Sequence, residues 1–153
     1  MMALAALVGA AAVGVSAAEQ GAPPNDPIVF CVNLSDEDQT SPVYSDGEGR
    51  GVLKLRRDDL TLSWDVSFTG LTGAAVAAQM HGPQRPGGNA SALFPLSEKP
   101  APTSPIKGSI VLDDARLKYL LNSRMYVNIT TAKYPAGEIR GQVQRIRPGA
   151  TCP

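Results

Sequence analysis

The sequence predicts an all-β protein built as an antiparallel β-sandwich with one short helix. Between residues 60 and 69, apolar residues (Leu, Trp, Val and Phe) alternate with Thr, Ser and Asp without exception. This period of two is the pattern of a strand with one buried and one wetted face. Seven or eight short segments of this kind are separated by turns rich in Gly and Pro, which is typical of two stacked antiparallel sheets.

Each element can be assigned in order along the chain. We expect strands over residues 28–33, 51–56, 60–69, 74–81, 91–94, 107–112, 125–131 and 138–146. Trp64 falls on the inward side of the third strand, so we expect a core anchor there. The spacing of Leu117, Leu120 and Leu121 predicts a helix over residues 113–121, capped by Asp113 or Asp114. A Greek-key, immunoglobulin-like arrangement is the natural architecture for these elements.

The N-terminal residues 2–18 are apolar and Ala-rich and end in small residues, the pattern of a signal peptide. We expect a signal peptide over residues 1–18 with cleavage near Ala17 or Ala18, although no Lys or Arg precedes the apolar stretch. The alternative is an uncleaved N-terminal helix. A Pro-rich linker over residues 19–27 then leads into one domain over residues 28–153. No later segment has the ~20 apolar residues of a membrane span. Because of the signal-peptide pattern, we expect a secreted or periplasmic protein.

Charge is balanced, with 14 basic and 14 acidic residues, which argues against a nucleic-acid partner. The basic residues Arg140, Arg145 and Arg147 are interpreted as a solvated strand edge. The acidic loop over residues 36–48 lacks the spacing of a calcium loop, so we expect it to be solvated as well.

The two cysteines, Cys31 and Cys152, lie near opposite ends of the domain. An even cysteine count in an exported protein favours pairing, so we predict a Cys31–Cys152 disulfide. The alternative is one thiol buried in a strand and another on the C-terminal tail. The pair is not spaced as a metal site or a redox motif.

Several short motifs appear in a fixed order along most of the chain. They are Thr69–Gly73, Ala78–Pro83, Gly87-Gly88, Arg116–Leu121, Tyr126–Thr131 and Gly137–Val143. In residue identity, order and spacing, these motifs resemble those of the CHRD domain, the module named after chordin and found in many secreted bacterial proteins. The residues that match the family's motifs are His81, Gly82, Tyr126, Asn128, Gly137, Glu138, Arg140 and Gly141. The resemblance implies an immunoglobulin-like sandwich with a faint likeness to copper/zinc superoxide dismutases, and no general activity.

This chain departs from the family pattern in its histidines. The family often has three, but here Gln79 and Thr130 stand at two of the places and only His81 remains. One imidazole alone does not hold a transition metal, so His81 is a weak candidate ligand and we expect no metal and no cofactor. We expect His81 to be a structural hydrogen-bonder that ties the Gly82-Pro83 turn to the strand containing Asn128 and Thr130.

The remaining motif residues also favour structural roles. Glu138 and Arg140 stand two apart in a predicted strand, so we expect a same-face ion pair beside Gly141, where another backbone or ring packs closely. There is no Gly-x-Ser-x-Gly nucleophile elbow, and one histidine is too little for a catalytic triad argument. We therefore assign no catalytic residue.

Two functional hypotheses follow from these residues. The first is an exported, non-enzymatic module that binds a protein or cell-envelope partner through the loops over residues 82–105 or 36–48. The second is a copper- or zinc-binding redox protein of the dismutase-like type, centred on His81. The single histidine favours the first.

Overall fold

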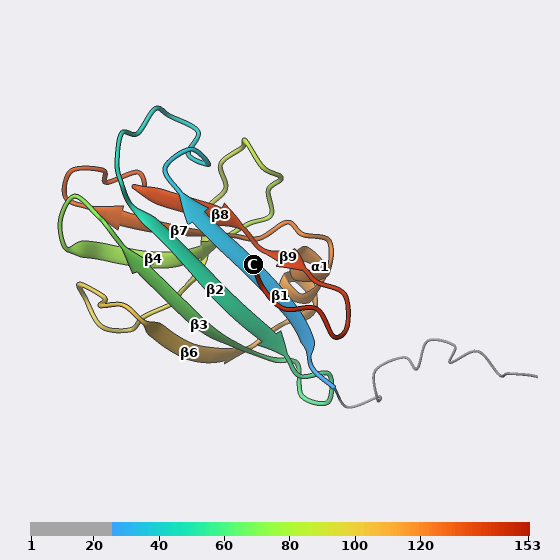
Figure 1. Ribbon diagram of the computed structural model, residues 1–153. Coiled ribbons are helices and arrows are strands. Elements are labelled where there is room, and N and C mark those ends of the chain that lie inside the picture. Colours follow the sequence, from blue (N-terminus) through green and yellow to red (C-terminus); the bar gives the residue numbers. More distant parts are fainter. Residues whose placement is uncertain (1–25) are drawn as a thin grey trace, which may run out of the picture.

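The structure, a computed structural model, describes residues 26–153 (Figure 1). The predicted signal peptide with its cleavage site near Ala17 and Ala18, and the linker up to residue 25, lie outside the described residues. The elements run in the order β1 (Ile28–Ser35), β2 (Glu48–Leu55), β3 (Thr61–Thr69), β4 (Ala75–His81), β5 (Ala92–Pro95), β6 (Ile106–Val111), α1 (Asp114–Leu121), β7 (Tyr126–Thr131), β8 (Ile139–Gln142) and β9 (Gln144–Arg145). The all-β prediction with one short helix is confirmed.

The strands form one hydrogen-bonded path rather than two separate sheets. Its order is β5-β4-β7-β8-β1-β2-β3-β6, with β9 also paired to β1, and every pair is antiparallel. The two halves meet at β1, where Ser35 pairs with Arg140 of β8 and Phe30 pairs with Arg145 of β9. The Greek-key sandwich is therefore not confirmed, because β1 joins what would have been two sheets into a continuous one.

The sheet curls into a half-barrel, which brings β3 opposite β5 although the two strands are far apart in the strand order. Trp64 on β3 lies against Phe94 on β5, with 5.9 Å between the ring centroids. The Trp64 indole N–H donates to the Leu96 carbonyl at 3.0 Å, just beyond the end of β5. Trp64 is 7% exposed, so the predicted core anchor is confirmed, and its ring links β3 to β5 across the inside of the curl.

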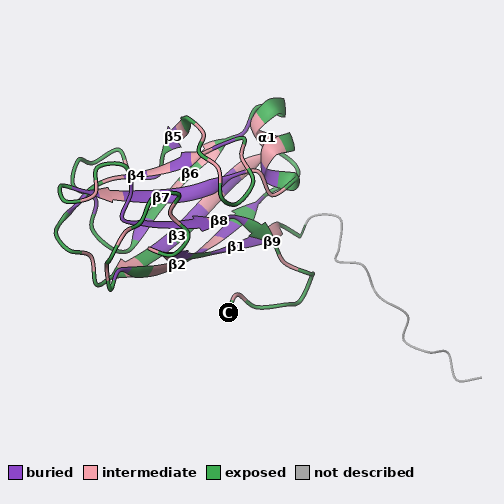
Figure 2. Ribbon diagram, turned by 90° about the horizontal axis from the view of Figure 1, so that it is seen from above, coloured by how far each residue is buried: buried purple, intermediate pink, exposed green. Residues whose placement is uncertain are grey.

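The core fills the inside of this curl, and most of the buried residues lie on strands, whereas the loops around them are mostly exposed (Figure 2). Of the residues predicted to face inward from residues 60–69, Leu62, Trp64 and Val66 are buried, whereas Leu60 and Phe68 at the two ends are half-buried. The largest fully buried apolar side chains are Phe30, Leu53, Leu55, Leu62, Met80, Leu96, Leu120, Met125, Ile129 and Ile139.

The helix α1 covers one end of the curl. Asp113 is its N-cap, and the Asp113 carboxylate accepts from the backbone N–H of Arg116 at 2.8 Å. Leu120 is fully buried, whereas Leu121 is 40% exposed, so the predicted apolar face is narrower than its three leucines suggested. Among residues 26–153, no helix combines the length and the apolar character that crossing a bilayer requires.

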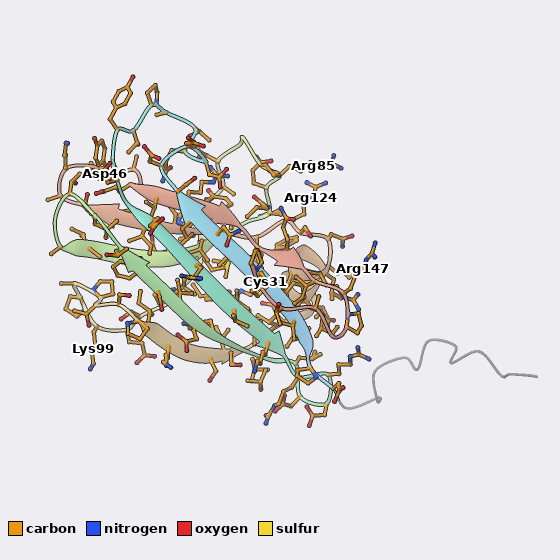
Figure 3. The ribbon with its side chains drawn as sticks, in the orientation of Figure 1. Cys31, Asp46, Arg85, Lys99, Arg124 and Arg147 are labelled. Atoms are coloured by element: carbon orange, nitrogen blue, oxygen red, sulfur yellow. A yellow bond between two sulfur atoms is a disulfide. The ribbon has the colours of Figure 1, made fainter. Side chains whose placement is uncertain are left out.

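The predicted disulfide is confirmed. Cys31 and Cys152 are bonded, with their Cα atoms 5.6 Å apart and a sequence separation of 121. Cys31 lies on the opposite side of β1 from Phe30 and Val32, and it is labelled near the middle of the sheet in Figure 3. The bond therefore ties the C-terminal tail to the outer side of the sheet.

Candidate functional site

The residues that carry the family motifs gather on one surface of the sheet, the outer side of β4, β7 and β8. The register places His81, Tyr126 and Gln142 in one row and Gln79, Asn128 and Arg140 in the next. Their neighbours along the strands, such as Met80 and Val127, face the core. We call this outer surface, defined by His81, Tyr126, Asn128, Arg140 and Gln142, the motif face.

Arg140 is buried beneath the loop that joins β4 to β5. It is 2% exposed, and its guanidinium donates to the Asn89 Oδ1 atom at 3.0 Å and to the Gly88 carbonyl at 2.6 Å. The guanidinium carbon also lies 3.6 Å from the centroid of the Tyr126 ring, which is cation–π geometry. The prediction that Arg140 belongs to a solvated strand edge is wrong, because this strand is interior and a loop covers it.

Burial lowers the pKa of Arg140, while the negative charges that Tyr126 and Asp38 can carry oppose this effect. An arginine remains cationic at neutral pH even so. Its charge is balanced by carbonyl and amide oxygens and by the aromatic ring. The arrangement holds a loop in place and leaves little of the guanidinium free to contact a ligand.

His81 holds the far end of the same loop. Its Nδ1 atom lies 2.9 Å from the Ala90 carbonyl, and its ring stacks on Tyr126 with 5.0 Å between centroids. The Tyr126 hydroxyl also bonds to Ala90, accepting from its N–H at 3.0 Å and donating to its carbonyl at 3.1 Å. Because β7 lies between β4 and β8, the Tyr126 ring stands between His81 and Arg140.

The hydrogen bond predicted from His81 to the strand of Asn128 and Thr130 goes instead to the loop, and only the stacking contact reaches that strand. The Nε2 atom of His81 is buried without a hydrogen-bond partner. Among residues 26–153, no three His, Cys, Asp or Glu side chains come together as a metal-binding group.

Glu138 joins two loops to β7 beside the motif face. This fully buried carboxylate accepts from the Ser45 hydroxyl at 2.5 Å, from the Thr131 hydroxyl at 2.6 Å, and from the backbone N–H and hydroxyl of Thr72 at 2.7 and 2.8 Å. Burial raises the pKa of Glu138, but the hydrogen bonds from Ser45, Thr131 and Thr72 outweigh it, so the pKa lies below its ordinary value. The carboxylate is therefore ionised at neutral pH.

The ion pair predicted between Glu138 and Arg140 does not form. Glu138 precedes β8, and its carboxylate reaches the turns around Ser45 and Thr72, whereas Arg140 reaches the loop around Asn89. The close approach predicted at Gly141 is present, because a Cβ there would collide with the backbone of Asn33 on β1.

Asn128 binds two more segments to the motif face. Its Oδ1 atom accepts from the Gln39 side chain at 3.0 Å, and its Nδ2 atom donates to the Ala136 carbonyl at 2.9 Å. The next residue, Gly137, has φ near +141°, and a Cβ there would meet the Asn128 side chain. Gly82 donates its N–H to the Ser91 carbonyl at 3.3 Å and so closes the base of the loop between β4 and β5.

Sequence reasoning missed the partners of these groups. Ser45, Thr72 and Asn89 all lie in loops, between 51 and 93 positions from the residue they bind. A Ser, Thr or Asn in a loop is common on any surface, so nothing in the sequence distinguishes these three from their neighbours.

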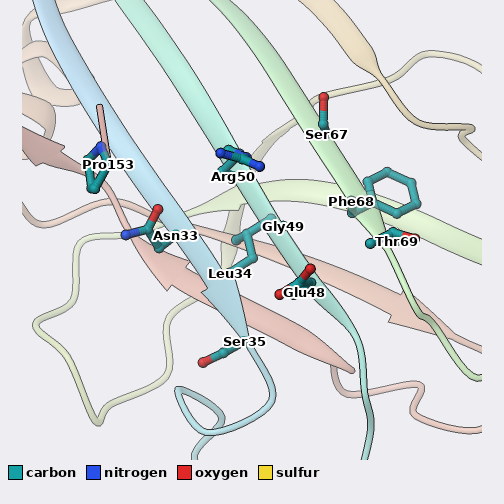
Figure 4. A pocket seen from close by; sticks show the side chains of 10 residues that line it. All are labelled: Asn33, Leu34, Ser35, Glu48, Gly49, Arg50, Ser67, Phe68, Thr69 and Pro153. Atoms are coloured by element: carbon teal, nitrogen blue, oxygen red, sulfur yellow. The ribbon is translucent and has the colours of Figure 1, made fainter. Parts of the chain in front are cut away.

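A hollow of about 410 Å³ lies on the outer side of β1, β2 and β3 (Figure 4). Asn33, Arg50 and Ser67 line it from the three strands, and Pro153 borders it from the C-terminal tail. The disulfide at the neighbouring Cys152 accounts for the position of Pro153.

The comparison with protein-family models supports the resemblance. The CHRD domain model matches residues 30–143, a span that holds every residue of the motif face. No curated protein and no solved structure matches the chain. The match covers well over half of the 153 residues, and the chain therefore belongs to the CHRD domain family.

Proposed function

We propose that this chain is an exported, non-enzymatic β module that binds a protein or a cell-envelope component through its loops. The observation that carries the proposal is that the two buried charged groups of this region contact loops. Arg140 and Glu138 both direct their polar atoms at loop residues, so these groups hold loops in place. Rigid loops on a β scaffold are a common basis for recognition.

Two of the loops form one composite surface. Thr40, from the loop between β1 and β2, and Asn89, from the loop between β4 and β5, exchange hydrogen bonds of 2.8 and 3.1 Å. The exposed side chains of this surface include Asp38 and Arg85. Because the motif face anchors both loops from below, their exposed residues can meet a partner without first being ordered.

Export is the second part of the proposal. The signal-peptide pattern of residues 1–18 supports it, and so does the disulfide, because such bonds persist in oxidising compartments. We propose that the protein is secreted or periplasmic. N-terminal sequencing of the mature protein isolated from the host should show that the chain begins directly after Ala17 or Ala18.

The binding proposal is tested by affinity capture from an envelope extract of the host, with the purified protein as bait. We expect a partner that the wild-type protein and a Lys54→Glu variant retain equally, because Lys54 is exposed on β2 away from these loops. A double variant, Asp38→Lys with Arg85→Glu, should lose that partner. Equal capture by all three proteins, or by none, would contradict binding through the loops.

The copper or zinc redox alternative has less support, because residues 26–153 offer no metal-binding group around His81. Metal analysis of the purified protein addresses it directly. Stoichiometric copper or zinc that disappears in a His81→Ala variant would favour the alternative.

A further inference from the structure

One outer strand of the sheet has an open hydrogen-bonding edge. In the described part of the chain, β6 pairs only with β3. Just beyond β6, the Leu112 N–H donates to the Leu60 carbonyl at 3.0 Å. In an antiparallel pair every second residue bonds to the partner strand, so Ile110, Gly108 and Ile106 direct their backbone groups toward β3. The N–H and C=O groups of Lys107, Ser109 and Val111 therefore point away from β3. No backbone hydrogen bond among residues 26–153 uses these groups.

The other outer strand, β5, is closed to pairing. It has only four residues, and its last residue, Pro95, has no N–H to donate. The Arg116 side chain of α1 donates to the Leu93 carbonyl at 3.1 Å and so occupies the outward edge of β5. The contrast between the two strands matters because proteins usually block exposed edges. Lys107 of β6 forms an ion pair with Asp65, with 2.7 Å between its Nζ atom and the carboxylate. Its charge is therefore offset and does not block the edge in the way that an unpaired lysine would.

A groove of about 720 Å³ runs beside the open edge. Trp64 and Phe94 line it together with Ile106 and Ile110 of β6, and the segment Ser97–Thr103 borders it on the far side. Lys99 projects outward from that segment, next to Glu98, so the border carries no excess charge (Figure 3). The groove thus combines apolar rings with an unused row of backbone donors and acceptors.

We propose that this edge binds an extended, uncharged peptide segment of a partner protein, which adds to β6 as a further strand. Donors and acceptors on alternate residues repeat every ~6.8 Å along a strand, and another extended backbone is the ligand that matches this spacing. On the inner side of the sheet, alternate side chains of the bound segment continue the row of Ile106, Gly108 and Ile110, so we expect them to be apolar. The inference rests on the proposed function only in taking the partner to be a protein.

The test begins with selection of random heptapeptides, displayed on phage, against the purified protein. We expect enrichment of sequences with apolar residues at alternate positions. A synthetic peptide of the selected sequence should bind the wild-type protein and a Ser109→Ala variant within about twofold of each other. A Ser109→Pro variant removes one outward N–H and leaves the β3 ladder intact, and it should bind at least about tenfold more weakly, which corresponds to ~1.4 kcal/mol.

A second measurement decides the question even if Ser109→Pro fails to fold. N-methylation of the peptide amides that face β6 should abolish binding to the wild-type protein, whereas N-methylation of the intervening amides should leave binding within about twofold. Equal effects of both methylation patterns, no enriched peptide, or β6-dependent association of two copies of this chain would each overturn the inference. If Ser109→Pro still captures an envelope partner that binds the loops, the proposed function holds even where the inference about β6 fails.

Discussion

Arg140 is a buried cation with no carboxylate partner among the contacts that it makes. Its compensation comes from the Gly88 carbonyl, the Asn89 amide oxygen and the face of Tyr126. Hydrogen bonds to a charged group stabilise by about 1.5–3 kcal/mol each, more than neutral ones. The geometry of the planar guanidinium also matters, because the compact ammonium of a lysine has neither its fixed fork of donors nor a flat face to stack on a ring.

We therefore expect Arg140→Ala to lower the free energy of unfolding by about 2–4 kcal/mol, because it removes both hydrogen bonds of the buried guanidinium and its contact with Tyr126. Arg140→Lys should recover only part of this loss. Urea unfolding followed by tryptophan fluorescence measures both. The exposed Arg145 provides the matched control, and Arg145→Ala should change stability by no more than about 0.5 kcal/mol. Similar losses at the two positions would contradict the role assigned to Arg140.

Glu138 should make stability depend on pH. Its pKa in the folded state lies below the ordinary value of 4.5 because its hydrogen bonds outweigh the effect of burial. A lowered pKa means that the unfolded chain binds the proton more tightly, so the stabilisation is complete above pH 4.5. It is lost as the pH falls through the lower, folded-state pKa.

Urea unfolding at a series of pH values checks this expectation. Glu138→Gln should be less stable than the wild-type protein at pH 7, because an amide NH₂ would face the donors of Thr72 and Thr131. The gap should narrow in acid, where the wild-type carboxylate is protonated. If the difference in free energy of unfolding between the two proteins stays constant down to acid pH, the role assigned to the Glu138 carboxylate is wrong.

At this scale the sequence showed which polar residues matter but not what they bind. Asn128, Glu138 and Arg140 stood out through their family motif. Their partners Gln39, Ser45 and Asn89 come from loops whose path depends on the finished sheet. The expected Glu138–Arg140 pair followed from strand periodicity alone, and it failed because Glu138 lies before the strand begins.

At the scale of elements, α1 depends on its N-cap. The Asp113 carboxylate accepts from the Arg116 N–H, one of the backbone donors that the helix itself cannot satisfy. We expect Asp113→Ala to lower stability by about 1 kcal/mol. Asp113→Asn keeps an acceptor in the same place and should lose much less. Thermal unfolding of both variants by circular dichroism measures the difference, and equal losses would rule out the capping role.

Most elements were predictable because their patterns are local. The unbroken alternation over residues 60–69 predicted β3 and the inward side of Trp64, and Asp113 marked the start of α1. The last strand was predicted as continuous over residues 138–146, but it divides at Val143, whose N–H donates to the Met125 carbonyl. There the chain leaves β7 and turns to β1, and no Gly or Pro signals the change.

At the scale of the whole molecule, the single curled sheet could not be predicted from the strand patterns. Two stacked sheets and one curled sheet bury the same alternate residues, so periodicity does not separate them. The decisive pairings involve few residues, one between Ser35 and Arg140 and two between β1 and β9. Cysteine count and position, in contrast, did predict the covalent link between the chain ends.

The disulfide should stabilise the whole fold rather than one element. It closes a loop of 121 positions, and reduction of a native bond in a small domain typically costs about 2–5 kcal/mol. We expect a loss in this range when a reducing agent is added, or in a Cys31→Ala, Cys152→Ala double variant. Urea unfolding of each sample measures it, and the reducing agent should have no effect on the double variant. An unchanged wild-type midpoint under reducing conditions would show that the link contributes little.

The claim that the motif residues act by holding loops is tested most directly by amide hydrogen exchange in Arg140→Ala, with Arg145→Ala as the reference. The reporting amides are those of Gly82, Gln84, Gly88 and Ala90, which donate to the carbonyls of Ser91, Arg124 and Arg85 and to the Tyr126 hydroxyl, respectively. We predict that Arg140→Ala speeds exchange at Gly88 and Ala90 while the amides of β4 and β7 stay protected. If these loop amides exchange as slowly as in the reference, Arg140 does not hold the loop, and the explanation offered for the family motif is wrong.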